Sequence, residues 1–240
     1  FAKAPQVSRG RRAAYPDYVS IREVGADGKV LLEHRFTGFY TTRVYTAQVS
    51  SVPFLRRKAE QVLGQSGFVP GSHLYKELSQ VLQELPRDDL FQVPLGQLAG
   101  TALGIMRIQE RNLVRLFLRR DSYGSFYYCL VYVPRDIYST ATRLKIQQVL
   151  MNRLGASASE FWTLFSDSNL VRVQFILNVN PHHTMEIDAL NIQEEVIQAS
   201  RGWSDDLGEQ LQETLGESRA REVLSQFSNG FPPGYSSRFT

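Results

Sequence analysis

Three side chains at one predicted strand-to-helix junction carry the chemistry that an amino-acid ligand would need. Arg135, Asp136 and Tyr138 follow a predicted strand that ends at Pro134. Arginine pairs with a carboxylate, aspartate accepts hydrogen bonds from an ammonium group, and a tyrosine ring can pack against the side chain of the ligand. The free N–H groups of a helix that starts near Ser139 would add donors for the carboxylate. These three residues are therefore the candidate effector-binding residues, and the sequence offers no candidate catalytic residue.

The same junction also allows a purely structural interpretation. An aspartate at a helix start accepts hydrogen bonds from free N–H groups, and an exposed Arg–Asp pair contributes less than about 1 kcal/mol to stability. The tripeptide Pro-Arg-Asp occurs a second time at Pro86, where we expect Asp88 and Asp89 to cap a helix. Both interpretations of the junction stay open at this point.

A stripe of small residues marks a predicted helix from Leu95 to Gln109. Gly96, Gly100 and Gly104 are spaced by four, so they share one helix face where another element can pack closely. A dinucleotide fingerprint would need G-x-G-x-x-G between a strand and a helix, and this helix is too short to span a membrane. The stripe therefore predicts close packing, and we expect no cofactor site in this chain.

Histidine and cysteine give no sign of a metal site or a nucleophile. His182 and His183 are adjacent, so their side chains point apart on an extended backbone, and no third ligand lies nearby in sequence. Cys129 is the single cysteine and lies within a predicted strand, where a buried thiol is inert. One cysteine cannot form an intrachain disulfide, which favours a reducing compartment. We expect no bound metal and a cytoplasmic location.

The elements around the junction follow the order ββαββα. Alternating and helical apolar patterns predict a hairpin over 113–136, a helix over 139–154, a hairpin over 161–179 and a helix over 186–200. Ser139 can cap the first of these helices and Gly155 can end it. Two helices on one face of a four-stranded antiparallel sheet give a two-layer α+β sandwich related to the ferredoxin-like plan.

The second predicted hairpin has one apolar face and one mixed face. Val173 and Phe175 alternate with Arg172 and Gln174 along its return strand, so we expect the first pair to be buried under the helices. The opposite face of the sheet is expected to be left to solvent or to a partner.

A similar hairpin-then-helix unit is predicted upstream. Strands over 18–24 and 30–40 flank the turn Gly25-Ala-Asp-Gly28. The helix after it carries Lys58-Ala-Glu-Gln-Val-Leu63, where the later helix carries Lys145-Ile-Gln-Gln-Val-Leu150. Chance explains this similarity equally well, because amphipathic helices often use these residue types. The repetition suggests two related modules.

Length and composition agree with two modest cores. The chain has 240 residues, is 42% hydrophobic and carries a net charge of +3. Its basic residues are dispersed, so we expect no nucleic-acid partner. No apolar run approaches roughly 20 residues and no leader is evident, so we expect neither a membrane span nor secretion. Because the chain starts at Phe1 rather than Met, we interpret it as a piece of a longer protein.

Seven short motifs occur in the order seen in the large bacterial NAD-specific glutamate dehydrogenases. They are Tyr15-Pro-Asp-Tyr18, Phe54-Leu-Arg-Arg-Lys58, Pro86-Arg-Asp-Asp-Leu-Phe91, Arg119-Arg-Asp121, Leu130-Val-Tyr-Val-Pro-Arg-Asp136, Trp203-Ser-Asp-Asp-Leu207 and Phe231-Pro-Pro-Gly-Tyr235. The match covers nearly the whole chain. It resembles the N-terminal, non-catalytic part of these enzymes, where tandem ACT-type domains precede the dehydrogenase domain.

The resemblance implies an α+β fold of ACT/ferredoxin-like two-layer modules, each an antiparallel sheet with helices on one face, joined by helical connecting segments. We predict a flexible N-terminal segment over 1–14, a first ACT-like module with a helical insertion over 15–109, a second ACT-like module over 110–200, and a helical linker over 201–240 toward a catalytic region.

The resemblance also implies a function. The parent enzyme would convert L-glutamate and NAD to 2-oxoglutarate and ammonia, and this segment would be regulatory or would support oligomerisation. Its expected partners are the catalytic region of its own chain, further copies in a homo-oligomer, and an amino-acid effector. Two alternatives are a purely structural oligomerisation arm with no ligand, and an independent enzyme with a site assembled from scattered residues.

Overall fold

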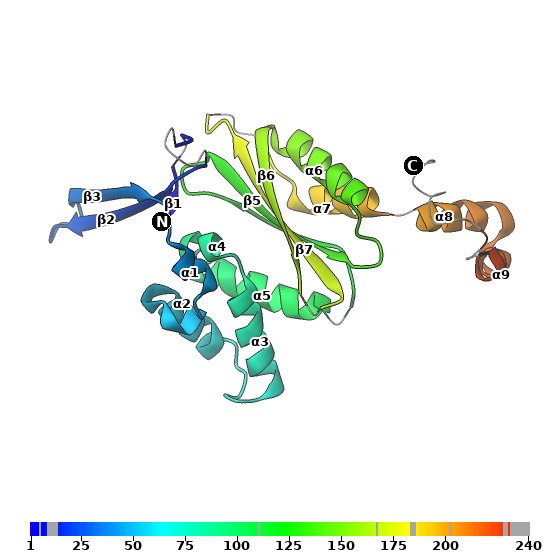
Figure 1. Cartoon of the computed structure of the whole chain (residues 1–240), viewed down its shortest axis with the longest axis horizontal. Coiled ribbons are helices and arrows are strands. Elements are labelled where there is room, and N and C mark those ends of the chain that lie inside the picture. Colours follow the sequence, from blue (N-terminus) through cyan, green and yellow to red (C-terminus); the bar gives the residue numbers. More distant parts are fainter. Residues whose placement is uncertain are drawn as a thin grey trace.

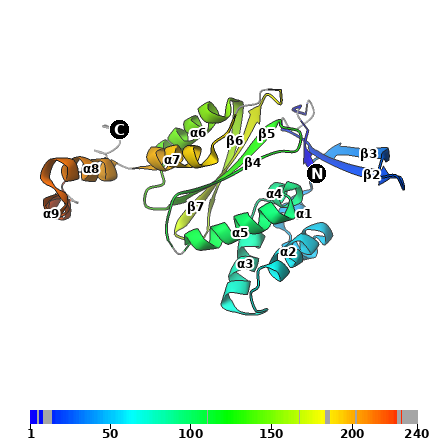
Figure 2. The same ribbon diagram turned by 180° about the vertical axis from the view of Figure 1, so that it is seen from behind.

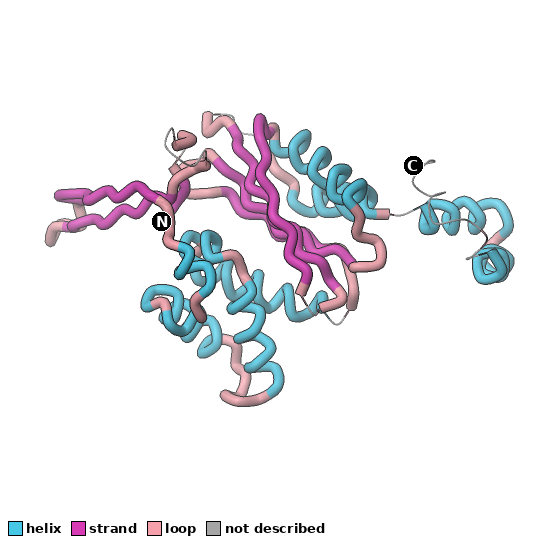
Figure 3. Tube along the Cα trace, viewed as in Figure 1, coloured by secondary structure: helices cyan, strands magenta, loops and turns pink. Residues whose placement is uncertain are grey.

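The computed structural model describes residues 1–4, 6–8, 14–109, 111–166, 168–182, 186–201, 203–227 and 230. Its strands are β1 (Ala2–Lys3), β2 (Asp17–Val24), β3 (Val30–Gly38), β4 (Arg115–Arg120), β5 (Phe126–Pro134), β6 (Ala156–Phe165) and β7 (Leu170–Val179). Its helices are α1 (Thr42–Thr46), the 3-10 helix η1 (Val49–Ser51), α2 (Pro53–Gln65), α3 (His73–Glu84), α4 (Arg87–Gln92), α5 (Leu95–Gln109), α6 (Thr140–Leu154), α7 (Ala189–Ser200), α8 (Trp203–Leu215) and α9 (Glu217–Phe227). The fold is α+β, as predicted (Figures 1 and 3).

The central sheet has four antiparallel strands in the order β4-β5-β7-β6. Helices α6 and α7 lie together on one face of this sheet (Figure 2). Ile146 and Leu150 of α6 and Val196 of α7 share a buried core with Val173 and Phe175 of β7. The predicted ββαββα order and the predicted buried face are both confirmed.

The ends of α6 confirm the two signals in the sequence. The Ser139 hydroxyl accepts a hydrogen bond from the backbone N–H of Thr142 at 3.0 Å, which satisfies one of the free donors of the first turn. Gly155 follows the last turn with a φ of 63°, a left-handed conformation that favours glycine. The helix therefore begins directly after Ser139 and ends directly before Gly155, as the sequence predicts.

The outer face of the central sheet is covered at its central strands, so the expectation that it is left to solvent or a partner is wrong there. Every residue of β5 is buried. Leu130 and Tyr132 of β5 and Leu170 of β7 join the core formed by α2, α3, α4 and α5, while Tyr15 packs on a smaller cluster around Tyr128. The physical reason is that β5 carries apolar side chains on both faces, so it needs a second covering layer.

Helix α5 approaches the central sheet most closely at one glycine. A Cβ at Gly104 would lie 2.8 Å from Cε1 of Phe117 on β4, whereas a Cβ at Gly96 or Gly100 would meet nothing within 4 Å. The predicted close packing of the stripe is thus confirmed at Gly104 only.

The N-terminal part forms a three-stranded antiparallel ribbon, β1-β2-β3, that projects from the body (Figure 1). The predicted hairpin is confirmed, and Gly28 has the positive φ of 79° that its turn requires. Ala2 and Lys3 are buried and pair with β2, and Lys3 forms ion pairs with Asp17 of β2 and Asp88 of α4. The flexible segment over 1–14 stays a prediction. The boundaries at 14, 109 and 200 stay predictions.

Helices α8 and α9 lie apart from the sheets at the C-terminal end (Figure 1). Asp205 and Asp206 belong to α8, but their side chains are outside the described part of the structure. In the ranges that the structure describes, none of the helices combines the length and hydropathy of a membrane span.

Candidate functional site

The predicted effector corner lies directly after β5, with Arg135 and Asp136 exposed. The Arg135 guanidinium donates to the backbone oxygen of Ser166 at 2.5 Å and lies 5.8 Å from the centroid of the Phe165 ring. Arg135 therefore already has a backbone acceptor and an aromatic neighbour at the end of β6.

Tyr138 contacts the same end of β6. Its hydroxyl lies 3.2 Å from Oγ1 of Thr163, and its ring meets the Phe165 ring edge-on at 5.5 Å between centroids. The structure thus brings Arg135 and Tyr138 together around Phe165. The assignment of an effector to this corner, with Asp136 as the ammonium acceptor, stays a prediction.

In the second Pro-Arg-Asp corner Arg87 is buried, whereas Pro86 and Asp88 are half-buried. The Arg87 guanidinium donates to the backbone oxygens of Ala47 at 3.0 Å, Gln83 at 2.9 Å and Leu85 at 3.3 Å. Burial, followed by the nearby charge of Arg172, lowers the pKa of Arg87. Through these hydrogen bonds Arg87 links the start of α4 to the end of α3 and to the segment after α1.

Asp88 belongs to an ionic cluster rather than to a helix cap. Its carboxylate accepts from Lys3 Nζ at 2.9 Å and from the Tyr45 hydroxyl at 3.0 Å, and Lys3 also donates to Asp17 at 2.9 Å. Burial alone would lower the pKa of Lys3, but the two carboxylates outweigh it and raise that pKa. Asp88 and Asp89 lie in the first turn of α4, as expected, where their charge favours the helix dipole. The N-cap of α4 is Pro86 and no side chain caps this helix, so the expected capping hydrogen bond is not formed.

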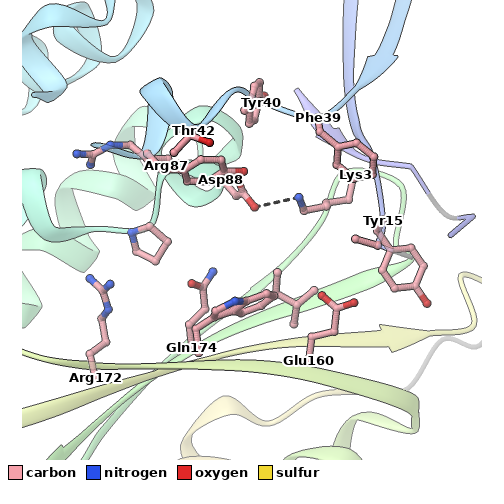
Figure 4. Close-up of a pocket in the computed structure, with 15 residues that line it drawn as sticks. Lys3, Tyr15, Phe39, Tyr40, Thr42, Arg87, Asp88, Glu160, Arg172 and Gln174 are labelled. Carbon is pink, nitrogen blue, oxygen red and sulfur yellow. Dashed lines mark hydrogen bonds and ion pairs between the residues drawn. The ribbon is translucent and has the colours of Figure 1, made fainter. Parts of the chain in front are cut away.

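A cavity of about 470 Å³ lies between this cluster and the outer face of the central sheet. One wall carries Lys3, Arg87 and Asp88, and the other carries Glu160 and Trp162 from β6 with Arg172 and Gln174 from β7. Figure 4 shows Glu160, Arg172 and Gln174 rising from the sheet toward the opposite wall. The cavity is thus lined by both cations and carboxylates.

The sequence pointed to Pro86, Asp88, Arg172 and Gln174 separately but did not predict that they line one cavity. Arg172 and Gln174 are polar positions in an otherwise apolar strand, and this interruption was the only local signal. Arg172 Nη1 donates to the backbone oxygen of Glu84, 88 positions away along the chain. A contact at that separation cannot be read from strand periodicity.

The cysteine and the histidines that we considered as a nucleophile or as metal ligands lie in surroundings that do not favour either role. Cys129 is fully buried, and burial raises the pKa of its thiol, so it is a poor nucleophile. His182 is exposed, whereas His183 lies outside the described residues. Within the described part of the chain, no group of three or more histidine, cysteine, aspartate or glutamate side chains is placed to hold a metal ion.

Three segments of the chain match models of glutamate dehydrogenase. Residues 115–204 match its ACT2 domain, residues 52–111 its helical motif 1, and residues 210–240 its helical motif 2. The ACT2 match starts at the first residue of β4, and the match to helical motif 1 covers α2 to α5.

Named relatives agree with these matches. The chain is 58% identical over 239 residues to an NAD-specific glutamate dehydrogenase of Pseudomonas aeruginosa and 43% identical over 240 residues to one of Halomonas elongata. It is 29% identical over 235 residues to one of Mycobacterium tuberculosis. These alignments cover 92% to 100% of the chain, which spans only about 15% of the length of the first two relatives. The predicted resemblance is confirmed.

Proposed function

We propose that this chain, which carries the ACT2 domain and the helical motifs of the NAD-specific glutamate dehydrogenases, is a non-catalytic regulatory and oligomerisation segment of such an enzyme. The parent would oxidise L-glutamate to 2-oxoglutarate and ammonia with NAD. Its nucleotide site and catalytic residues would belong to another region of the same polypeptide, which would be the first partner of this segment. The proposed compartment is the cytoplasm.

The topology of the sheets carries this proposal. Every strand pair in the described residues is antiparallel. A dinucleotide-binding fold is built on a mostly parallel sheet with a glycine-rich turn at a helix start. The glycines of α5 lie inside a helix, and the Phe117 ring packs against one of them, Gly104. The observed architecture therefore supports a regulatory module rather than a site for hydride transfer.

In the proposed function, an amino-acid effector acts on the parent through this segment. Arg135, Asp136 and Tyr138 form the site that the sequence predicts for it. An Arg135→Ala variant should lose ligand-induced thermal stabilisation and keep its unliganded Tm within a few degrees, because Arg135 is exposed. Unchanged affinity in that variant would assign the effector to another site.

A purely structural arm without a ligand is the second candidate, and the projecting ribbon favours it. Ile21, Leu32 and Phe36 share one face of the β2–β3 hairpin and are 55%, 49% and 58% exposed. The same face also carries the Glu23–His34 pair, whereas the other face carries Arg22, Glu33 and other polar residues. Exposed apolar residues on one side of a ribbon are typical of a protein interface.

The test compares the longer enzyme with and without this segment. Size-exclusion chromatography with light scattering reports the oligomeric mass, and NADH formation at varied amino-acid concentrations reports regulation. A regulatory segment predicts that its removal abolishes an amino-acid response. A structural arm predicts a smaller assembly with no change in that response. If mass and response both stay unchanged, the proposed function is wrong.

A further inference from the structure

We infer that a cleft between α5, the start of β4 and α7 binds a small phosphate ester with an aliphatic body. Arg107, Arg111 and Arg115 line this cleft, which we call the arginine cleft, together with apolar residues. Its volume of about 510 Å³ lies within the range of roughly 300–1,000 Å³ that small-ligand sites have. It shares no lining residue with the cavity beside Pro86, and the inference does not depend on the proposed function.

The three arginines come from two elements that a tight turn joins. Arg107 lies in the last turn of α5, and Arg111 follows directly after that helix. The turn contains Asn112, whose φ of 50° is left-handed, and it leads the chain into β4. Arg115 begins β4 on the same strand face as Phe117, whose ring packs against α5. Arg115 therefore faces the helix that carries Arg107, and Figure 2 shows α5, β4 and α7 next to one another.

The arginine cleft carries positive charge without an acidic partner. Arg107, Arg111 and Arg115 are exposed, and their guanidinium groups form no ion pair or hydrogen bond in the part of the chain that the structure describes. None of the described residues that line the cleft is an aspartate or a glutamate. Cations at the end of a helix favour its dipole, which accounts for the two arginines of α5 and its end but not for Arg115 on the strand. A bound anion accounts for all three.

The charge and geometry of the cleft favour a phosphate group. Each guanidinium offers a planar fork of donors, and the several oxygens of a phosphate can accept from more than one arginine at once. The partial negative charge at the end of α5, about half a unit, is small beside three full positive charges. An α-amino acid suits the cleft poorly, because no carboxylate of the described lining residues is available for its ammonium group.

The floor of the cleft is aliphatic, which defines the rest of the ligand. Ile108 is only 7% exposed, and Val114, Ile137 and Ile197 are half-buried. These side chains come from the end of α5, the start of β4, the segment after β5, and α7. The described lining residues include no aromatic ring on which a planar base could stack. Each square ångström of apolar ligand surface that this floor removes from water contributes about 25 cal/mol, so an aliphatic body strengthens binding beyond that of phosphate alone.

The experiment measures binding to the chain by isothermal titration calorimetry, with hexyl phosphate as the probe. Inorganic phosphate lacks the aliphatic body, hexanol lacks the anion, and norleucine replaces the phosphate by the zwitterion of an amino acid. The variants are Arg111→Gln and Arg115→Gln, and Arg115→Lys keeps the charge but loses the planar fork. Arg57→Gln is the matched control, since Arg57 is an exposed arginine of α2 that does not line the cleft. Circular dichroism verifies that each variant is folded.

We expect hexyl phosphate to bind at least about tenfold more tightly than inorganic phosphate, and hexanol and norleucine to give no measurable heat of binding. Arg111→Gln and Arg115→Gln should each weaken binding of hexyl phosphate by about tenfold or more, because each removes a charge-assisted hydrogen bond. Arg115→Lys should bind more weakly than the unchanged chain but more tightly than Arg115→Gln. The Arg57→Gln control should bind as the unchanged chain does.

Any of three results would overturn the inference. In the first, hexyl phosphate does not bind. In the second, it binds no more tightly than inorganic phosphate, which would indicate an adventitious ion only. In the third, both Arg111→Gln and Arg115→Gln bind it with unchanged affinity, which would assign the anion to another surface of the chain.

Discussion

Asp89 of α4 and Arg119 of β4 form a buried ion pair at 2.6 Å, with side chains 11% and 10% exposed. The pair joins the helical segment to the edge of the central sheet, and the Arg119 guanidinium also lies 4.2 Å from the centroid of the Tyr128 ring. Burial raises the pKa of Asp89 even though Arg119 opposes the shift. The two parts of the molecule are thus held together by charge as well as by apolar contact.

Removal of one partner of this pair should be costly. Arg119→Met leaves the Asp89 carboxylate buried and unpaired, so we expect the free energy of unfolding to fall by about 3–5 kcal/mol. Arg153→Met is the control, since the Arg153–Glu195 pair is 45% and 39% exposed and should contribute less than about 1 kcal/mol. Urea denaturation measures both. Equal losses would show that the buried pair has no special role.

The two glycines Gly104 and Gly100 should respond to alanine with opposite signs. A Cβ at Gly104 would overlap the Phe117 ring, which packs in the core, so Gly104→Ala should lower the free energy of unfolding by about 1–3 kcal/mol. Gly100 has open space, so Gly100→Ala should raise it by about 0.5–1 kcal/mol through the higher helix propensity of alanine. Thermal or urea unfolding of the two variants tests the close approach of α5 to β4. A stabilised Gly104→Ala protein would refute it.

The β2–β3 ribbon should weaken in acid because of Glu33. Hydrogen bonds from Ser20, Arg35 and Arg22 lower the pKa of Glu33 from its usual 4.5 to about 2. Since the folded-state pKa lies below the unfolded one, the contribution of Glu33 is fully present above pH 4.5 and is lost as the pH falls to about 2.

An NMR titration of the Glu33 carboxyl checks this directly, with Glu33→Gln as the variant in which this part of the acid sensitivity should be absent. A midpoint near the usual value of 4.5 would show that the network around Glu33 does not form in solution.

Much of the central sheet could be predicted because its signals are local. Val173 and Phe175 alternate with polar residues, and Ser139 and Gly155 satisfy the ends of α6 within a few positions of the chain. These features need only strand alternation and capping chemistry.

The second covering layer and the cavity depend on contacts between distant segments. The Arg119–Asp89 and Arg172–Glu84 contacts join positions 30 and 88 apart, and neither helix nor strand periodicity records such pairings. Asp88 and Asp89 were expected to cap α4 because a carboxylate in a first turn has that local use. Lys3 and Arg119, which come from elsewhere in the chain, bind them instead.

The central claim is that this chain is a non-catalytic part of an NAD-specific glutamate dehydrogenase. The most direct measurement follows NADH absorbance when L-glutamate and NAD are added to the purified chain and, in parallel, to a longer enzyme that contains it. We expect NADH formation by the longer enzyme and none by the chain alone, because every strand pair in the described residues is antiparallel. Glutamate-dependent NADH formation by the purified chain would contradict it.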